Sequence, residues 1–320
     1  MSYNLISKKE IEDAHLRIIP YINQTPIMSS QQINNIFGCE ILFKCENFQK
    51  VGAFKTRGAV NAVFSLDQEQ KKYGVCTHSS GNHAQALARA ASLANITAHI
   101  VMPNNAPKVK VAAVKDYGGK IYFCEPSQDA REELLKEVME ETKATFIHPY
   151  DKLEIIAGQA TAAKELINSV SDLDMIIAPV GGGGLLSGTA LSNYYFSKNS
   201  LVIGAEPKNA DDAFRSFNSG EFVSAGNPKT LADGLLTSLG DFTFPIIKEY
   251  VDKIFTCSEE NIVKSMQLIY ERMKIVVEPS SAVALAIIME NPDFFRNKKL
   301  GIIISGGNVD LEGFFNTFET

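Results

Sequence analysis

Three short segments of this chain carry side chains and turns that could act together in catalysis. The first holds Lys55, the second spans residues 79–83, and the third, residues 181–184, consists of glycine alone. A lysine amine forms a Schiff base with a carbonyl compound. Backbone N–H groups of a glycine-rich turn bind phosphate, because no side chain keeps the anion away from them. Lys55 is therefore a candidate Schiff-base lysine beside a phosphate site.

The four glycines lie between a strand pattern and a helical pattern. Residues 176–180 are apolar, and residues 185–190 read as the start of a helix, whose free N–H groups and dipole attract an anion. Two nucleotide motifs are excluded. Leu186 or Ser187 stands where G-x-G-x-x-G needs its last glycine, and Thr189 stands where a P-loop needs lysine. The phosphate then belongs to another cofactor, unless the run is simply a tight turn.

The segment of residues 79–83 also follows a strand pattern, at residues 75–77, and precedes a helical one, at residues 84–94. Its polar residues are Ser79, Ser80, Asn82 and His83. Parallel strands bind ligands at their carboxyl ends, so this group of polar side chains indicates a ligand site. The alternative is helix capping, for which serine and asparagine are preferred residues.

Composition limits the kinds of protein that this chain can be. Its 320 residues are 45% hydrophobic and 21% charged, as in folded globular proteins, and the net charge of −6 argues against nucleic acid as a partner. No apolar run approaches the ~20 residues of a membrane span, and residues 1–12 are too polar for a signal peptide. The five cysteines include no Cys-x-x-Cys pair, which favours reduced thiols, packing roles and a cytoplasmic protein.

The elements that must position these segments alternate between strands and helices. Apolar, β-branched runs predict strands at residues 40–46, 74–78, 98–102, 120–124, 175–179, 201–205, 253–256 and 300–304. Amphipathic patterns predict helices at residues 129–142, 154–170 and 259–276. Strands that are apolar almost throughout favour parallel sheets covered on both faces, so we predict an α/β fold. We expect a domain junction at residues 148–151 and a functional loop at residues 207–228.

Taken in order, these motifs resemble a known enzyme family. Lys55, residues 79–83, the glycine run and residues 305–308 (Ser-Gly-Gly-Asn) follow the order seen in fold-type II pyridoxal-phosphate (PLP) enzymes. Within them, the chain is similar to the serine racemase and serine/threonine dehydratase branch, which includes hydroxyaspartate dehydratases. The resemblance extends from Thr25 to Gly306.

The resemblance implies a fold like that of the tryptophan synthase β chain. Two open, twisted, mostly parallel sheets would be flanked by helices, with PLP in the cleft between two domains. Residues 1–65 and 150–320 would form the large PLP-binding domain, and residues 66–149 a small mobile one.

The resemblance also assigns residues to the cofactor. Lys55 would be the Schiff-base lysine, and Phe54 and Asn82 would contact the PLP ring and its O3′. The phosphate loop would be Gly181, Gly182, Gly183, Gly184 and Leu185. Ser305 would face the pyridine nitrogen, where a hydroxyl makes PLP a moderate electron sink that favours β-elimination.

For the substrate, the resemblance implies that Ser79, Ser80, Asn82 and His83 bind the amino-acid carboxylate. Ser80 corresponds to the serine of racemase-like members, on the cofactor face opposite the lysine. Two acid–base groups on opposite faces, Lys55 and Ser80, would allow racemisation alongside elimination. Alternatively, Ser80 only caps the helix or binds carboxylate.

Two further positions remain open between a functional and a structural interpretation. The resemblance implies that Glu206, the Ala210 carbonyl and Asp212 hold a divalent cation, Mg²⁺ or Ca²⁺, because the ligands are all oxygen. The carboxylates could instead form a solvated acidic turn. Glu278 precedes a helix and either faces the cofactor pocket or caps the helix dipole.

The function implied is PLP-dependent dehydration and deamination of L-serine and related β-hydroxy amino acids to 2-oxo acid and ammonia, with serine racemase activity. The nearest alternative is a threonine- or 3-hydroxyaspartate-selective ammonia-lyase. A β-replacing synthase and a non-catalytic binding module of the same fold are more distant alternatives. The family resemblance implies a homodimer and, for some members, a nucleotide effector. The net charge and the lack of a long apolar run argue against nucleic-acid and membrane partners.

Overall fold

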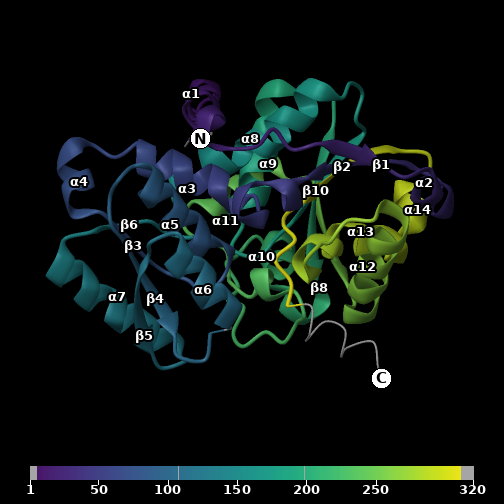
Figure 1. The fold of residues 1–320 in the computed structure, drawn as a ribbon. Coiled ribbons are helices and arrows are strands. Elements are labelled where there is room, and N and C mark those ends of the chain that lie inside the picture. Colours follow the sequence, from purple (N-terminus) through teal and green to yellow (C-terminus); the bar gives the residue numbers. More distant parts are fainter. Residues whose placement is uncertain (1–5, 107, 198, 311–320) are drawn as a thin grey trace.

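The computed structural model describes residues 6–106, 108–197 and 199–310, which form two separate β-sheets flanked by helices (Figure 1). The six-stranded sheet has the order β1-β2-β10-β7-β8-β9, and the four-stranded sheet has the order β5-β4-β3-β6. The strands are β1 (Ile27–Ser29), β2 (Glu40–Cys45), β3 (Val75–His78), β4 (Ala98–Pro103), β5 (Lys120–Cys124), β6 (Thr145–Phe146), β7 (Met175–Pro179), β8 (Leu201–Pro207), β9 (Lys253–Cys257) and β10 (Lys299–Ile304).

The helices cover both faces of each sheet. They are α1 (Lys8–Ile18), α2 (Gln31–Phe37), α3 (Lys55–Phe64), α4 (Gln68–Tyr73), α5 (Asn82–Leu93), α6 (Lys108–Asp116), α7 (Gln128–Thr142), α8 (Leu153–Ser169), α9 (Gly184–Phe196), α10 (Asp212–Ser219), α11 (Thr243–Tyr250), α12 (Glu259–Met273), α13 (Pro279–Glu290) and α14 (Pro292–Phe295). Figure 1 shows the four-stranded sheet with α4 to α7 in one half of the molecule, and α12 and α13 in the other.

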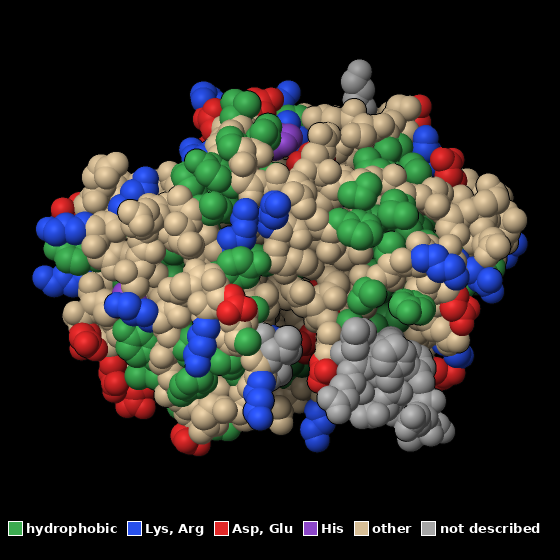
Figure 2. All heavy atoms as spheres, viewed as in Figure 1, with side chains coloured by type: hydrophobic (Ala, Val, Ile, Leu, Met, Phe, Trp, Pro, Cys, Tyr) green, Lys and Arg blue, Asp and Glu red, His purple; other side chains and the backbone are tan. Residues whose placement is uncertain are grey.

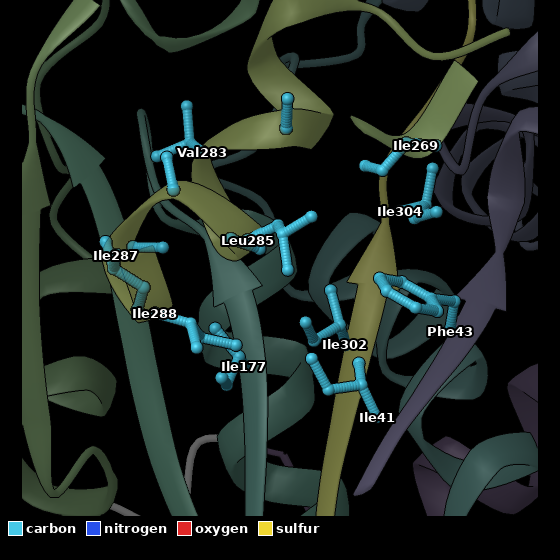
Figure 3. Packing of buried hydrophobic residues seen from close by; sticks show 14 of the residues in the cluster. Ile41, Phe43, Ile177, Ile269, Val283, Leu285, Ile287, Ile288, Ile302 and Ile304 are labelled. Carbon is cyan, nitrogen blue, oxygen red and sulfur yellow. The ribbon is translucent and has the colours of Figure 1, made fainter. Parts of the chain in front are cut away.

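The core of the six-stranded sheet explains its parallel strands. Ile177 of β7 packs with Ile302 of β10 toward α12 and α13, a cluster that includes Leu285 (Figure 3). On the opposite face, Ala178 of β7 and Ile303 of β10 pack toward α8 and α9. Successive strand residues point to opposite faces, so a strand covered on both sides must be apolar throughout. The predicted α/β fold with mostly parallel sheets is confirmed, and among the strands of the described residues only β1 runs antiparallel, to β2.

The strand prediction missed two short strands, and no helix was predicted within residues 207–228. β1 and β6 have three and two residues, too few to show a period. The predicted loop at residues 207–228 was partly wrong, because it contains the eight-residue helix α10. This helix is stabilised from outside its own sequence, since the Glu206 carboxylate accepts hydrogen bonds from Ala213 N and Phe214 N at its first turn.

A buried charge network fixes the start of α3. The Arg57 guanidinium, which is fully buried, donates to Glu46 of the segment after β2 and to Glu165 of α8 over distances of 2.7–2.8 Å. Glu165 also accepts from Lys44 Nζ at 2.6 Å, and its pKa lies below its usual value despite burial, because hydrogen bonds from His15 and Arg57 and the positive charges of Arg57 and Lys44 stabilise the carboxylate. The network therefore joins β2, α3 and α8 two residues beyond Lys55.

The structure also bears on the cysteines, the apolar segments and the charged residues of the sequence. All five cysteines are buried and free, as expected for packing residues. Among the described residues, no helix has the length and apolarity needed to cross a membrane. Acidic and basic side chains are interspersed on the face of the molecule seen in Figure 2.

Candidate active site

The candidate residues are brought together because they follow the carboxyl ends of parallel strands. Lys55 comes after β2, the glycine run after β7 and Ser305 directly after β10, and these three strands are neighbours in the six-stranded sheet. Residues 79–83 follow β3 of the four-stranded sheet. Asn82 then reaches the six-stranded half through Glu278, so the two sheets meet at one site.

Lys55 is the first residue of α3 and is half-buried. Its ammonium donates a hydrogen bond to Pro149 O at 2.9 Å and lies 5.2 Å from the centre of the Phe54 ring. Burial lowers the pKa of Lys55 to about 8, although the nearby Glu278 carboxylate acts in the opposite direction. The amine is thus more easily deprotonated than an ordinary lysine, as a nucleophile or general base requires.

The backbone next to Lys55 is tied to the segment that carries Ser305. Phe54 N donates to Ser305 O at 2.9 Å, Ala53 pairs with Gly306 as an isolated β-bridge, and Gly307 N donates to Gly52 O at 2.9 Å. These bonds hold Lys55 and Ser305 in a fixed relation, although 250 residues separate them in the chain.

The glycine run forms a tight turn into α9 in which side chains cannot be accommodated. Gly183 has a φ of +86°, which favours glycine. A Cβ on Gly181 would lie 2.7 Å from Leu235 Cα, and one on Gly182 would lie 2.4 Å from the Tyr150 ring. The first intrahelical bond runs from Ser187 N to Gly183 O, so the preceding N–H groups are free for an anion. The loop fits a phosphate group.

The connection between the two sheets holds this loop from one side. Tyr150 packs on Gly182, and the Asp151 carboxylate accepts from Asp241 N, Phe242 N and Thr243 N at the start of α11. Thr243 Oγ1 in turn donates to Gly182 O at 2.9 Å. The loop conformation therefore depends on residues that directly follow Pro149, the acceptor of the Lys55 amine.

The segment of residues 79–83 does not cap its helix. The N-cap of α5 is Gly81, and no side chain caps this helix, so the capping alternative for Ser80 and Asn82 is wrong. Ser79 Oγ accepts from Gly81 N at 3.3 Å. His83 is buried, its Nε2 bonds to Ile147 O at 3.2 Å, and its Nδ1 has no partner. Burial and the charge of Lys55 hold the pKa of His83 well below its usual value, so its ring is neutral.

Glu278 faces the site and does not cap α13 with its side chain. Both carboxylate oxygens accept from Asn82 Nδ2, at 3.0 and 3.1 Å, while Asn82 Oδ1 accepts from Asn308 Nδ2 at 2.9 Å. Burial raises the pKa of Glu278 to about 7, even though the hydrogen bond from Asn82 lowers it. These contacts favour the interpretation that Glu278 faces the cofactor pocket. Asn308 also contacts this group through Asn82, a role that the sequence motif of residues 305–308 did not reveal.

Ser305 is buried at the end of β10, where its hydroxyl lies 2.9 Å from Ser281 Oγ. Ser281 Oγ also accepts from Gly306 N and donates to Gly306 O, both at 2.7 Å. Since Ser281 has only one proton and uses it on the Gly306 carbonyl, Ser305 donates to Ser281 and offers a lone pair elsewhere. Ser281 is thus a supporting residue that the sequence did not reveal.

The three residues considered for a cation lie at the end of β8, in the turn that follows it and at the start of α10. Glu206 is fully buried and accepts two backbone N–H bonds from α10, and both oxygens of the buried Asp212 carboxylate lack a partner. Burial raises the pKa of Glu206 to about 9 and that of Asp212 to about 6. The described residues contain no group of three or more His, Cys, Asp or Glu side chains arranged for a metal. The unpaired Asp212 oxygens nevertheless fit a cation.

With this geometry established, comparison with known proteins is informative. A family model for "pyridoxal-phosphate dependent enzyme" matches residues 18–306. The chain belongs to this family, which confirms the predicted family and its PLP cofactor.

The relatives and solved structures narrow the class further. The chain is 51% identical to beta-hydroxyaspartate dehydratase of Paracoccus denitrificans (strain Pd 1222), covering 93% of this chain and 95% of the relative. It is 50% identical to serine racemase of Dictyostelium discoideum, covering 96% of each chain. The crystal structure of serine racemase from Dictyostelium discoideum superposes with a TM-score of 0.91 at 49% identity, covering 95% of this chain and 99% of that one. The fold and the family are therefore those of PLP-dependent racemases and ammonia-lyases.

The raised pKa of Glu278 predicts a pH dependence of stability. Between about 4.5 and 7 the folded protein holds a proton on Glu278 that the unfolded chain releases, so stability is lost as the pH rises through this range. Glu278→Gln removes this titration, and the variant should gain up to about 3 kcal/mol relative to the original protein above pH 7. Chemical denaturation at a series of pH values measures the difference. An equal pH dependence in both proteins would contradict the assignment.

Proposed function

We propose that this protein removes the β-hydroxyl and amino groups of L-serine and related β-hydroxy amino acids, giving a 2-oxo acid and ammonia, and also racemises serine. The observation that carries the proposal is the convergence of Lys55, the glycine loop and Ser305 at the carboxyl ends of β2, β7 and β10. The similarity to racemases and dehydratases of hydroxy amino acids supports it.

The residues of this site fit PLP, which when bound would withdraw electrons from the substrate Cα. Lys55 would hold the cofactor covalently and later move the Cα proton as a general base, a role that its lowered pKa favours. Gly181 to Leu185 would bind the phosphate with their free N–H groups. Phe54 would pack against the ring, Asn82 would contact its O3′, and the Ser305 hydroxyl would face the pyridine nitrogen.

On the substrate side, Ser79 and the backbone N–H groups of Asn82 and His83 would bind the carboxylate at the start of α5, because the neutral His83 ring uses its one N–H on Ile147 O. Ser80 would hold or release a proton on the cofactor face opposite Lys55, which permits inversion at Cα. The absence of a capping bond from Ser80 to α5 leaves its hydroxyl free for this role.

A second candidate is selectivity for 3-hydroxyaspartate over serine and threonine. It is favoured by the similarity to a beta-hydroxyaspartate dehydratase, which is at least as high as the similarity to serine racemase. Both candidates share the same bond-breaking steps and the same role for Lys55, so they differ only in the substrate side chain.

We also propose that residues 66–149 form a small mobile domain against a large domain of residues 1–65 and 150–320. The division is supported by the separate four-stranded sheet, whose strands all lie within residues 75–146. A homodimer and a nucleotide effector remain proposals that rest on the family resemblance, and a cytoplasmic location remains one that rests on the cysteine pattern of the sequence.

Replacing Lys55 tests the central proposal. Lys55→Ala should abolish formation of 2-oxo acid from L-serine and remove the visible absorbance of covalently held PLP, because no amine remains to bond the cofactor. Lys50→Ala, which removes an exposed lysine from the preceding turn, is the matched control and should retain both. Elimination that persists in Lys55→Ala would refute the assigned role.

Replacing Ser80 separates the two activities. Ser80→Ala should abolish the conversion of L-serine to D-serine while retaining elimination from L-serine, because only inversion needs a proton from the second face. Chiral chromatography measures inversion, and 2-oxo acid release measures elimination. Loss of both activities to the same extent would mean that Ser80 only binds the substrate.

We also propose a cation site, in which Glu206, Ala210 O and Asp212 bind Mg²⁺ or Ca²⁺. All the proposed ligands are oxygen, and a cation would supply the partner that the Asp212 carboxylate lacks. The ion would have a structural role, since Glu206 lies on β8, which β10 and β7 separate from β2, the strand that precedes Lys55.

Chelation tests this proposal. EDTA should lower the melting temperature of the protein, and added Mg²⁺ or Ca²⁺ should restore it, because ligand binding stabilises the folded state. Asp212→Asn should lose this response. Asp211→Asn, which breaks only an exposed pair with Arg215, is the control and should keep it. A melting temperature unaffected by EDTA would contradict a metal here.

A further inference from the structure

One ion pair joins the two halves of the protein directly beside the candidate site. Lys110 Nζ donates to Asp233 Oδ2 at 2.6 Å. Lys110 belongs to α6, which packs on α5 and β5 of the four-stranded half. Asp233 begins the short 3₁₀ helix η5 (Asp233–Leu235), which packs on α13 of the six-stranded half. The pair therefore spans the gap between the two sheets.

The Asp233 end of this pair lies on the wall of the site. Gly234 N donates to Ser280 Oγ at 3.0 Å, next to Ser281, which supports Ser305. Leu235 Cα lies 2.7 Å from the position that a Cβ on Gly181 would occupy. The segment thus runs between the phosphate loop and the start of α13. Lys110 lies close enough to Glu278 for its charge to lower the pKa of that carboxyl, and Asp233 raises it.

The two partners are unequally enclosed. The Lys110 side chain is 18% exposed, whereas the Asp233 side chain is 51% exposed. An ion pair with one solvated partner contributes little stability, so exchange of the aspartate for another carboxylate costs little. After such an exchange, the Lys110 ammonium would still be paired with a carboxylate, and the displaced Asp233 carboxylate would be solvated by water.

We propose that Lys110 determines substrate choice by receiving the second carboxylate of a dicarboxylic hydroxy amino acid, which displaces Asp233. The inference rests on the proposed function and names the substrate class that this site would prefer. L-threo-3-hydroxyaspartate carries the second carboxylate, and serine and threonine do not. The substrate carboxylate would then take the place of Asp233 as the partner of Lys110. The direct ion pair between α6 and η5 would be replaced by a contact of α6 with the bound dicarboxylate.

The alternative is that the pair is only a latch between the two halves. A latch and a carboxylate receptor respond differently when each partner is removed. Lys110→Met and Asp233→Asn break the same ion pair, so a latch predicts the same effect for both variants and for every substrate. A receptor predicts opposite effects, because one variant removes the group that binds the substrate and the other removes its competitor.

The test compares kcat/KM of the holoenzymes for L-threo-3-hydroxyaspartate and L-serine. In Lys110→Met the ratio of the two values should fall about tenfold or more, as expected for loss of a charged hydrogen bond, and in Asp233→Asn it should rise. Lys115→Met removes an exposed charge from another face of α6 and should leave the ratio unchanged. A ratio that is unchanged in Lys110→Met, or that moves the same way in both variants, would overturn the proposal.

A binding measurement separates this inference from the proposed function. Succinate, a dicarboxylate, should raise the melting temperature more than propionate does, and Lys110→Met should abolish the difference. The comparison does not depend on turnover, so it tests Lys110 even if the enzyme acted on neither substrate, an outcome that would refute the proposed function alone. Equal stabilisation by succinate in Lys110→Met and in the original protein would refute the role of Lys110.

Discussion

The site depends on the buried charge network around Arg57. Four charged side chains, Lys44, Glu46, Arg57 and Glu165, are removed from water and satisfied mainly by one another. Removing one member of such a network typically costs ~3–5 kcal/mol, because the remaining charges stay buried. Its members come from β2, the turn after it, α3 and α8, so the network determines where α3 begins. Lys55 is two residues before Arg57 and takes its position from this constraint.

Around this fixed lysine, the other groups approach from separate strand ends. The backbone bonds between Phe54 and Ser305 join two of them, and the side-chain bonds from Asn82 to Glu278 join the two sheets. Burial raises the pKa of Glu278 toward neutrality. Glu278 also shares the site with Lys55, whose pKa burial lowers toward neutrality. The site is thus a region where protons move at little cost, which suits acid–base chemistry at Cα.

Sequence reasoning predicted the eight longer strands and located the three motifs, because both signals are local. A parallel strand is apolar on both faces, and a glycine run next to a strand is visible without its partners. The partners of Arg57 and Glu278 were not predictable, because they lie up to 196 residues away and depend on how the sheets meet. Helix α10 was missed because its first N–H groups are satisfied by Glu206, which precedes it on a strand.

The short connection of residues 148–151 between the sheets has a consequence for how the enzyme could diverge. Its consecutive residues make three separate contacts. The Pro149 carbonyl accepts a hydrogen bond from the Lys55 amine, Tyr150 packs on the glycine turn, and Asp151 accepts hydrogen bonds from the start of α11. A substitution that alters one of these contacts shifts the backbone of the adjacent residues and so disturbs the other two. New substrate preferences should therefore arise more readily at the exposed margin of the cleft than in this segment, which keeps the catalytic centre the same while its specificity changes.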